Sequence, residues 1–138
     1  MAYRPYLFFA GDCREAFTRY EEIFGGDLTI MTGADVPGGE PPPGQADLVV
    51  HAALAHGDDL LMASDDPEHS SYGPDQRIMV SYDAADADDA RRVFDALADG
   101  GQVTQELQQT FFSDAFGMCV DRFGTPWMVV APGPGDQA

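Results

Sequence analysis

Residues 3–26 read YRPYLFFAGDCREAFTRYEEIFGG, and this stretch sets the pattern for the whole chain. Its first eight residues are apolar and aromatic and lead into Gly11 and Asp12, which predicts a strand followed by a turn. From Cys13 to Phe24, apolar residues recur at steps of three and four, which predicts a helix ended by a Gly-Gly pair. Asp12 and Glu15 have the spacing of a capping box, so we expect Asp12 to cap this helix.

The segments that follow repeat this pattern once. Three predicted strands come after the first helix. The order then begins again with one strand, a helix at Asp86–Leu97 and three more strands. The Pro- and Gly-rich segment Gly33–Gly44 is expected to form a surface loop, and Gly57-Asp58 the tip of a hairpin. The predicted strands are Tyr3–Ala10, Asp27–Thr32, Asp47–Ala55, Asp59–Ser64, Arg77–Tyr82, Val103–Leu107, Phe116–Val120 and Pro126–Ala131.

This order of elements predicts an α+β fold made of two βαβββ modules. We expect one domain over residues 1–138, with half-modules at about 3–65 and 77–131. Two curved sheets with their helices outside would form a half-closed cup lined by alternate strand residues. The repeat lies in the order of elements and not in residue identity, so a chance alternation in an ordinary α+β domain stays open as an alternative.

The chain is strongly acidic, with a formal net charge of −17, and all seven of its basic residues are arginines. Such a surface repels phosphate backbones and anionic lipids, so nucleic acid and membranes are not expected partners. A cationic or neutral ligand fits better. The charge is also consistent with a general solubility trait of the source organism.

Two features indicate the compartment. Cys13 and Cys119 lie far apart, which gives no disulfide framework and suits a reducing environment. The N-terminus shows no signal peptide, and the longest apolar runs are about five residues, far short of a membrane span of about 20. We therefore expect a cytoplasmic protein.

Three segments carry a family resemblance: PYLFFAGDCREAFTRYEEIFGG (5–26), HAALAHGDDLLMASD (51–65) and FFSDAFGMCVDRFGTPWMVV (111–130). They resemble the PhnB-like family of the glyoxalase / bleomycin-resistance / extradiol-dioxygenase superfamily, also called the vicinal oxygen chelate fold. The resemblance covers nearly the whole chain and implies paired βαβββ modules around a small-molecule pocket, assembled as a homodimer. Some PhnB-like proteins carry a methyltransferase label, but no glycine-rich loop follows the first strand here, so we do not expect that activity.

The resemblance also implies where a metal would sit. Enzymes of the superfamily take His or Glu ligands from the first and last strands of each half, and such ligands suit Zn, Ni, Fe or Mn. The corresponding positions here fall near Pro5, Arg77 and Met128, and in the segment 61–63. Because none of these residues is His, Glu or Asp, we predict that the metal site is absent and that no cofactor is bound.

Two residues are candidate general bases. Strand alternation places His51 on one face with Val49 and opposite Val50, Ala52 and Leu54, so His51 can face the cup, although a structural histidine is the alternative. Asp114, in the last motif, is the other candidate. Asp65 could accept a hydrogen bond from a ligand or cap the following loop.

The predicted ligand contacts combine aromatic, thioether and polar side chains, as ligand pockets do. Arg77 could bind an anionic group, and the aromatic residues, with Phe111 beside them, could equally be plain core. Asp121 and Gly124 are expected to hold the turn before the last strand, and Cys119 to be unreactive. The predicted contacts are Arg77, Met62, Ser64, Phe112, Phe116, Trp127 and Met128.

Three functions are consistent with the sequence. The first, which we favour, is metal-free binding of a small organic molecule. The second is a metal-dependent lyase or dioxygenase of the same superfamily. The third is a metal-independent enzyme on that fold, using Asp114 or His51 as a general base.

Overall fold

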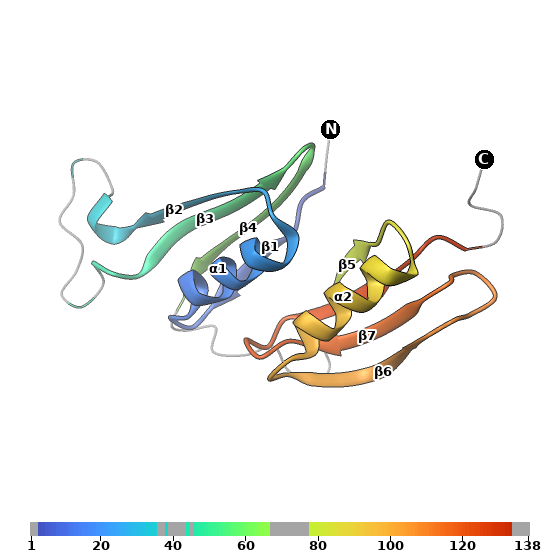
Figure 1. Ribbon diagram of the computed structural model, residues 1–138. Coiled ribbons are helices and arrows are strands. Elements are labelled where there is room, and N and C mark those ends of the chain that lie inside the picture. Colours follow the sequence, from blue (N-terminus) through green and yellow to red (C-terminus); the bar gives the residue numbers. More distant parts are fainter. Residues whose placement is uncertain (1–2, 36–37, 39–43, 45, 67–77, 134–138) are drawn as a thin grey trace. The chain divides into compact units, whose positions relative to one another are not determined.

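The computed structural model describes residues 3–35, 38, 44, 46–66 and 78–133. The chain divides into two compact units, Met1–Ser71 and Tyr72–Ala138, and each is described by itself below. In both units a helix lies across one face of a four-stranded sheet (Figure 1). The predicted α+β class and the repeated βαβββ order are confirmed.

Unit 1 has the sheet order β1-β4-β3-β2. β1 runs parallel to β4, whereas the other neighbours are antiparallel. A short 3₁₀ turn, Gly33–Asp35, follows the second strand, within a segment expected to be irregular. The elements are β1 (Tyr6–Phe9), α1 (Cys13–Phe24), β2 (Asp27–Thr32), β3 (Val49–His56) and β4 (Asp59–Asp65).

Unit 2 repeats this topology with the order β5-β8-β7-β6. Its first and last strands, β5 and β8, are the parallel pair. The predicted bounds of β7 are met, and those of the other elements differ by one to three residues at their ends. The elements are β5 (Val80–Asp83), α2 (Ala87–Ala98), β6 (Gln102–Gln108), β7 (Phe116–Val120) and β8 (Pro126–Val130).

The apolar stripe of each helix builds the core of its unit. In unit 1 the rings of Phe9 and Phe17 meet edge to face at 6.2 Å, and Phe17 meets Tyr20 at 5.4 Å. In unit 2 the stripe of α2 predicted from the sequence is buried against its own sheet. Apolar burial of this kind contributes about 25 cal/mol per Å² to folding. The buried stripe of α2 is Ala90, Val93, Phe94 and Leu97.

The two helices begin differently. Asp86 caps α2 as a local cap should, because its Oδ1 accepts the Asp89 amide at 2.8 Å. Asp12 makes no side-chain cap bond at α1, so the predicted capping box is wrong. Asp65 takes its place: the Asp65 Oδ1 accepts the Cys13 amide at 3.0 Å, from the end of β4.

Two predicted strands are shorter than expected. β1 begins at Tyr6 because Pro5 has no N–H to continue the ladder, although its carbonyl still accepts the Met62 amide at 3.3 Å. β5 begins at Val80, where pairing with Trp127 of β8 starts. Arg77, expected in that strand, lies outside the described residues.

An irregularity in β3 changes which valine is buried. The register with β2 shifts between Met31 and Thr32, so that Thr32 pairs with Val49 and Met31 with His51. Val49 is therefore buried and Val50 is 41% exposed, the reverse of the alternation predicted for them. Beyond the shift the expected alternation holds, with Ala52 and Leu54 buried.

Gly25 and Gly26, which end α1, offer a matched test of close packing. Both have positive φ, 75° and 96°, but only the Gly26 position is crowded, since an added Cβ would lie 2.5 Å from the Ala55 carbonyl oxygen. We expect Gly26→Ala to destabilise unit 1 by about 2–3 kcal/mol and Gly25→Ala by about 1 kcal/mol. Urea unfolding of both variants checks this difference, and equal losses would show that left-handed strain alone fixes both glycines.

Candidate functional site

Each sheet has one face covered by its helix and one that the helix leaves open. Along β1 burial alternates: Leu7 and Phe9 are buried under α1, whereas Tyr6 is 38% and Phe8 40% exposed. We call the face opposite the helix the open face. Two large aromatic side chains therefore lie on the open face of unit 1, where a sheet facing only water normally carries polar residues.

Strand register extends this face across unit 1. Tyr6 pairs with Met62 and Phe8 with Ser64, and Met31, which pairs with His51, is 41% exposed. Directly paired residues share a face of the sheet. The structure thus places the predicted residues His51, Met62 and Ser64 on one face, together with Tyr6, Phe8, Met31, Ala53 and, towards its other end, Asp27, Thr29, Ala55 and Leu60.

His51 lies within an aromatic group on this face. The Tyr6 hydroxyl lies 3.4 Å from His51 Nδ1, and the two ring centroids are 5.9 Å apart. The Phe8 ring lies 5.3 Å from that of Tyr6. His51 is half-buried, and Nδ1 is the ring nitrogen in contact with Tyr6.

The open face of unit 2 is also apolar at its centre. Met118 pairs with Met128, and Phe116 with Val130, all of them half-buried. On the edge strand β5, Tyr82 turns towards the helix and donates to Asp89 at 2.7 Å, so Ser81 and Asp83 lie on the open side. Members of this open face include Ser81, Asp83, Phe116, Met118, Met128 and Val130.

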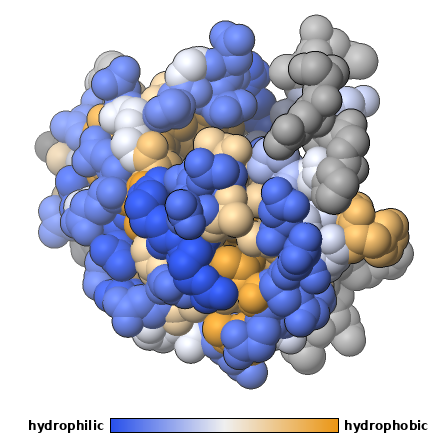
Figure 2. Space-filling view, turned by 45° about the vertical axis from the view of Figure 1, so that its right-hand side comes forward, coloured by the Kyte–Doolittle hydropathy of each residue, from blue (hydrophilic) through white to orange (hydrophobic). Residues whose placement is uncertain are grey.

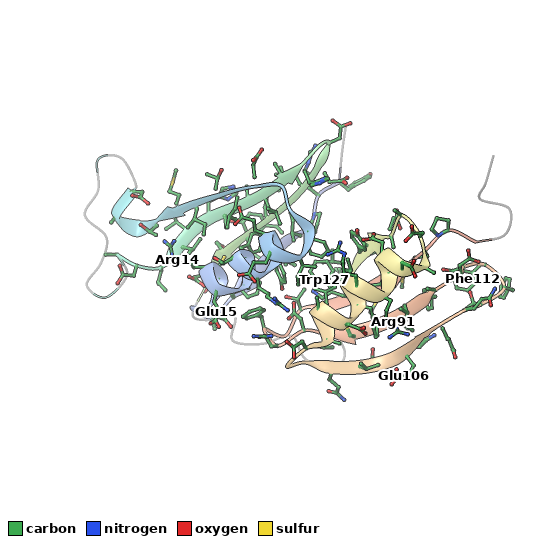
Figure 3. All side chains as sticks on the ribbon, viewed as in Figure 1. Arg14, Glu15, Arg91, Glu106, Phe112 and Trp127 are labelled. Atoms are coloured by element: carbon green, nitrogen blue, oxygen red, sulfur yellow. The ribbon has the colours of Figure 1, made fainter. Side chains whose placement is uncertain are left out.

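A hydrogen-bonded loop extends the aromatic character beyond β7. The Phe112 ring meets Phe116 and Phe111 edge to face, each at 5.1 Å, and Phe111 is 91% exposed. The loop is firmly built, because buried Ser113 donates to the Ala131 carbonyl at 2.6 Å. Figure 3 shows Phe112 at the far end of the β6–β7 hairpin.

Asp114 lies in the same loop, and its carboxylate takes part in none of the hydrogen bonds found within the described residues. It is exposed, and its backbone amide donates to the Pro132 carbonyl at 3.0 Å. His51, the other candidate base, belongs to the other unit. The described hydrogen bonds give the His51 ring one partner, the Tyr6 hydroxyl, and give the Asp114 carboxylate none, so neither residue is assigned a catalytic role.

Trp127 belongs to the core of unit 2. It is 2% exposed, lies beside α2 (Figure 3), and donates its indole N–H to the Asp121 Oδ2 at 2.9 Å. Asp121 also accepts the amides of Phe123 and Thr125, which confirms its predicted role in the turn before β8. We therefore carry Met128, and not Trp127, into the proposed ligand surface; Arg77 lies outside the described residues.

The two thiols are buried and kept protonated. Burial raises the pKa of Cys13 to about 12, with the Asp65 carboxylate adding to the effect. Burial likewise raises the pKa of Cys119 to about 11. Because the thiolate is the nucleophile and metal ligand, these cysteines suit neither role, as expected for Cys119.

The donor set of the open faces does not match a Zn, Ni, Fe or Mn site. On the open faces, the first and last strands of each unit offer aromatic, hydroxyl and thioether groups with Asp83 as their carboxylate, and His51 of β3 adds one imidazole. Within the described residues, no three His, Cys, Asp or Glu side chains gather where they could hold a metal. These metals take several imidazole, thiolate or carboxylate ligands together, and the described residues do not supply such a set.

Several open-face residues were missed from the sequence. Tyr6, Phe8, Met31 and Met118 all stand at alternate positions of strands whose ranges were predicted, so the strand period itself carried the signal. The metal position that the family resemblance implies falls at Pro5, one residue before Tyr6. Asp83 was not predicted as an open-face residue because the predicted strand ended at Tyr82, one residue before it.

The surface agrees with the acidic composition. Figure 2 shows one face of the molecule, mostly hydrophilic with small apolar areas between. Neither helix in the described part of the chain has the length and apolarity needed to cross a bilayer.

Comparison with known proteins shows relatives along the whole chain. Protein YjdN of Escherichia coli K12 is 30% identical, over 94% of this chain and 94% of its own. The crystal structure of PA1353 from Pseudomonas aeruginosa is 38% identical, covers 97% of this chain and 99% of its own, and superposes with a TM-score of 0.86.

A PhnB protein from Bacillus cereus, provisionally described as a 3-demethylubiquinone-9 3-methyltransferase, shares the fold. It is 21% identical, over 95% of this chain and 99% of its own, with a TM-score of 0.74. Residues 4–129 match the Glyoxalase/Bleomycin resistance protein/Dioxygenase superfamily, which agrees with the two βαβββ units and with the motifs that end in Pro126 and Trp127. The chain belongs to the Glyoxalase/Bleomycin resistance protein/Dioxygenase superfamily.

Proposed function

We propose that the protein binds a small organic molecule on the open faces of its sheets, without a metal. The observation that carries this proposal is the half-exposed aromatic and thioether surface opposite each helix. Tyr6 and Phe8 are 38% and 40% exposed, and Met31 is 41% exposed. Apolar side chains grouped with a few polar ones are typical of ligand surfaces.

Supporting observations come from both units. Unit 1 adds the imidazole of His51 and the hydroxyl of Ser64 to its aromatic pair, and unit 2 adds Asp83 to a thioether surface. The superfamily takes part of its name from resistance to a small molecule, bleomycin. A homodimer, a cytoplasmic location and ligand contacts by Met62, Ser64, Phe112, Phe116, Met128 and Arg77 belong to the same proposal.

A thermal-shift screen of small organic molecules is the direct test. A ligand that binds only the folded state stabilises it by about 2.7 kcal/mol at 100 times its Kd, so Tm should rise. We expect Phe8→Gln and Met118→Gln to reduce the shift produced by every hit on their own face. Val103→Gln is the matched control, since Val103 is 37% exposed but pairs with Cys119 and so lies off the open face.

Elemental analysis separates this proposal from the metal-dependent alternative. Protein incubated with Ni, Zn or Mn and then desalted should retain well under one metal per chain. One tightly held metal per chain would contradict metal-free binding and favour the lyase or dioxygenase class. Ligands whose thermal shift is unchanged in both Phe8→Gln and Met118→Gln would bind away from the open faces.

A further inference from the structure

The contact between Tyr6 and His51 spans two strands that are not neighbours. Tyr6 stands on β1 and His51 on β3, with β4 between them, yet the Tyr6 hydroxyl lies 3.4 Å from His51 Nδ1. The Tyr6 and His51 rings are tilted by 33°, and the Phe8 ring centroid lies 5.3 Å from that of Tyr6. The pair therefore spans three of the four strands of unit 1, from β1 across β4 to β3.

Hydrogen-bond chemistry assigns the roles in this long contact. A neutral imidazole has one nitrogen that donates and one that accepts, and the partner of one nitrogen decides which is which. The phenolic O–H is a better donor than its oxygen is an acceptor, so Tyr6 donates to Nδ1. The proton of neutral His51 then resides on Nε2, so that the ring next to Tyr6 carries an N–H donor.

We propose that Tyr6 sets His51 in the Nε2–H form, so that unit 1 selects neutral, planar molecules carrying a hydrogen-bond acceptor. This inference rests on the proposed function and names the class of ligand. The rings of Tyr6 and Phe8 supply the flat apolar surface, and Met31 and Met62 extend it with flexible thioethers. The single N–H fixes the orientation of a carbonyl oxygen or an aromatic ring nitrogen.

The negative charge of the protein favours a ligand whose hydrogen-bond acceptor is neutral. The chain carries a formal net charge of −17, and charges act over about 8 Å at physiological salt. A carboxylate or phosphate would meet this repulsion on approach, and the described open face of unit 1 holds no Lys or Arg to offset it. A ketone, amide or pyridine-type nitrogen meets none.

Long-range ¹H–¹⁵N NMR tests the tautomer without any ligand. At a pH where His51 is neutral, we expect its Nε2 to show the protonated shift and its Nδ1 the pyridine-like shift. In Tyr6→Phe, which keeps the ring, the two forms should mix towards the ratio of a free histidine. A dominant Nδ1–H form, or an unchanged ratio in Tyr6→Phe, would overturn the role given to Tyr6.

Binding of isoquinoline and naphthalene tests the ligand class. The two probes have the same shape and differ in one ring nitrogen, so NMR titration at matched concentrations isolates the acceptor. We expect isoquinoline to bind about fivefold tighter, the effect of one neutral hydrogen bond. The preference should vanish in His51→Phe, which keeps an aromatic ring but removes the donor.

The two proposals can fail separately. Equal binding of both probes, or binding of neither while the wider screen yields hits on this face, would overturn the ligand class and leave small-molecule binding standing. A screen without a single hit would remove the proposed function. The tautomer measurement would still decide whether Tyr6 sets His51.

Discussion

Replacing Asp121 by alanine is expected to lower the free energy of unfolding of unit 2 by about 4 kcal/mol. Asp121 is 5% exposed, and its Oδ1 accepts the amides of Phe123 and Thr125, each at 2.9 Å. Its Oδ2 accepts the Trp127 indole N–H, also at 2.9 Å. Alanine removes the carboxylate acceptor from all three donors in a largely dry environment, and the loss of such a hydrogen bond costs about 1–3 kcal/mol.

Urea unfolding followed by tryptophan fluorescence measures this effect locally, since Trp127 is the single tryptophan of the chain. Asp121→Asn should lose about 2 kcal/mol, because its remaining oxygen still accepts the two turn amides while its NH₂ faces the indole donor. Asp114→Ala is the matched control: Asp114 is exposed, and its loss should change stability by about 0.5 kcal/mol or less. Equal effects at Asp121 and Asp114 would refute the role of the buried carboxylate.

Replacing Asp65 by alanine should destabilise unit 1 by about 3 kcal/mol. The Asp65 Oδ1 accepts the amides of Gly11 and Cys13, and its Oδ2 accepts the amide of Val49, all at 3.0 Å. One side chain thereby joins the turn after β1, the first turn of α1 and the start of β3. Its negative charge also suits the positive end of the helix.

Asp12→Ala is the informative comparison, because the sequence pattern assigns the cap of α1 to Asp12. With no cap bond from its side chain, Asp12 should contribute about 0.5 kcal/mol or less. Asp65→Asn should fall between the two, since a neutral acceptor replaces a charged one. Chemical denaturation of the three variants ranks them, and a larger loss for Asp12→Ala than for Asp65→Ala would restore the local cap.

Local periodicity predicted the elements well because the stripes of α1 and α2 and the strand periods are properties of neighbouring residues. The bounds Cys13–Phe24 and Phe116–Val120 are met for that reason. The cap of α1 was mispredicted because its acceptor, Asp65, lies on a distant strand. The exchange of Val49 and Val50 follows from a register shift against β2, which no pattern within β3 reveals.

The sequence predicted the type of candidate site, an apolar ligand surface with a few polar groups, but not all of the residues that form it. His51, Met62 and Ser64 were singled out and stand on one open face, whereas the exposed rings beside them, Tyr6 and Phe8, were not. Trp127 shows the converse, because an aromatic residue in a ligand-like motif gives no sign of which sheet face it occupies until its partner Asp121 is seen. The period of a single strand groups its residues into two faces, whereas pairing across the sheet shows which faces of neighbouring strands join and which face the helix covers.

The parallel pairing of the first and last strands of each unit bears on the order in which the protein is made. Tyr6 finds its partner Met62 only after β2, β3 and most of β4 have been synthesised. During translation β1 therefore leaves the ribosome as an unpaired apolar strand, of the kind that invites association with other chains. Because unit 1 is complete at Ser71, it can close before β5 emerges, and the same vulnerable interval then recurs for β5 until Trp127 to Val130 are added.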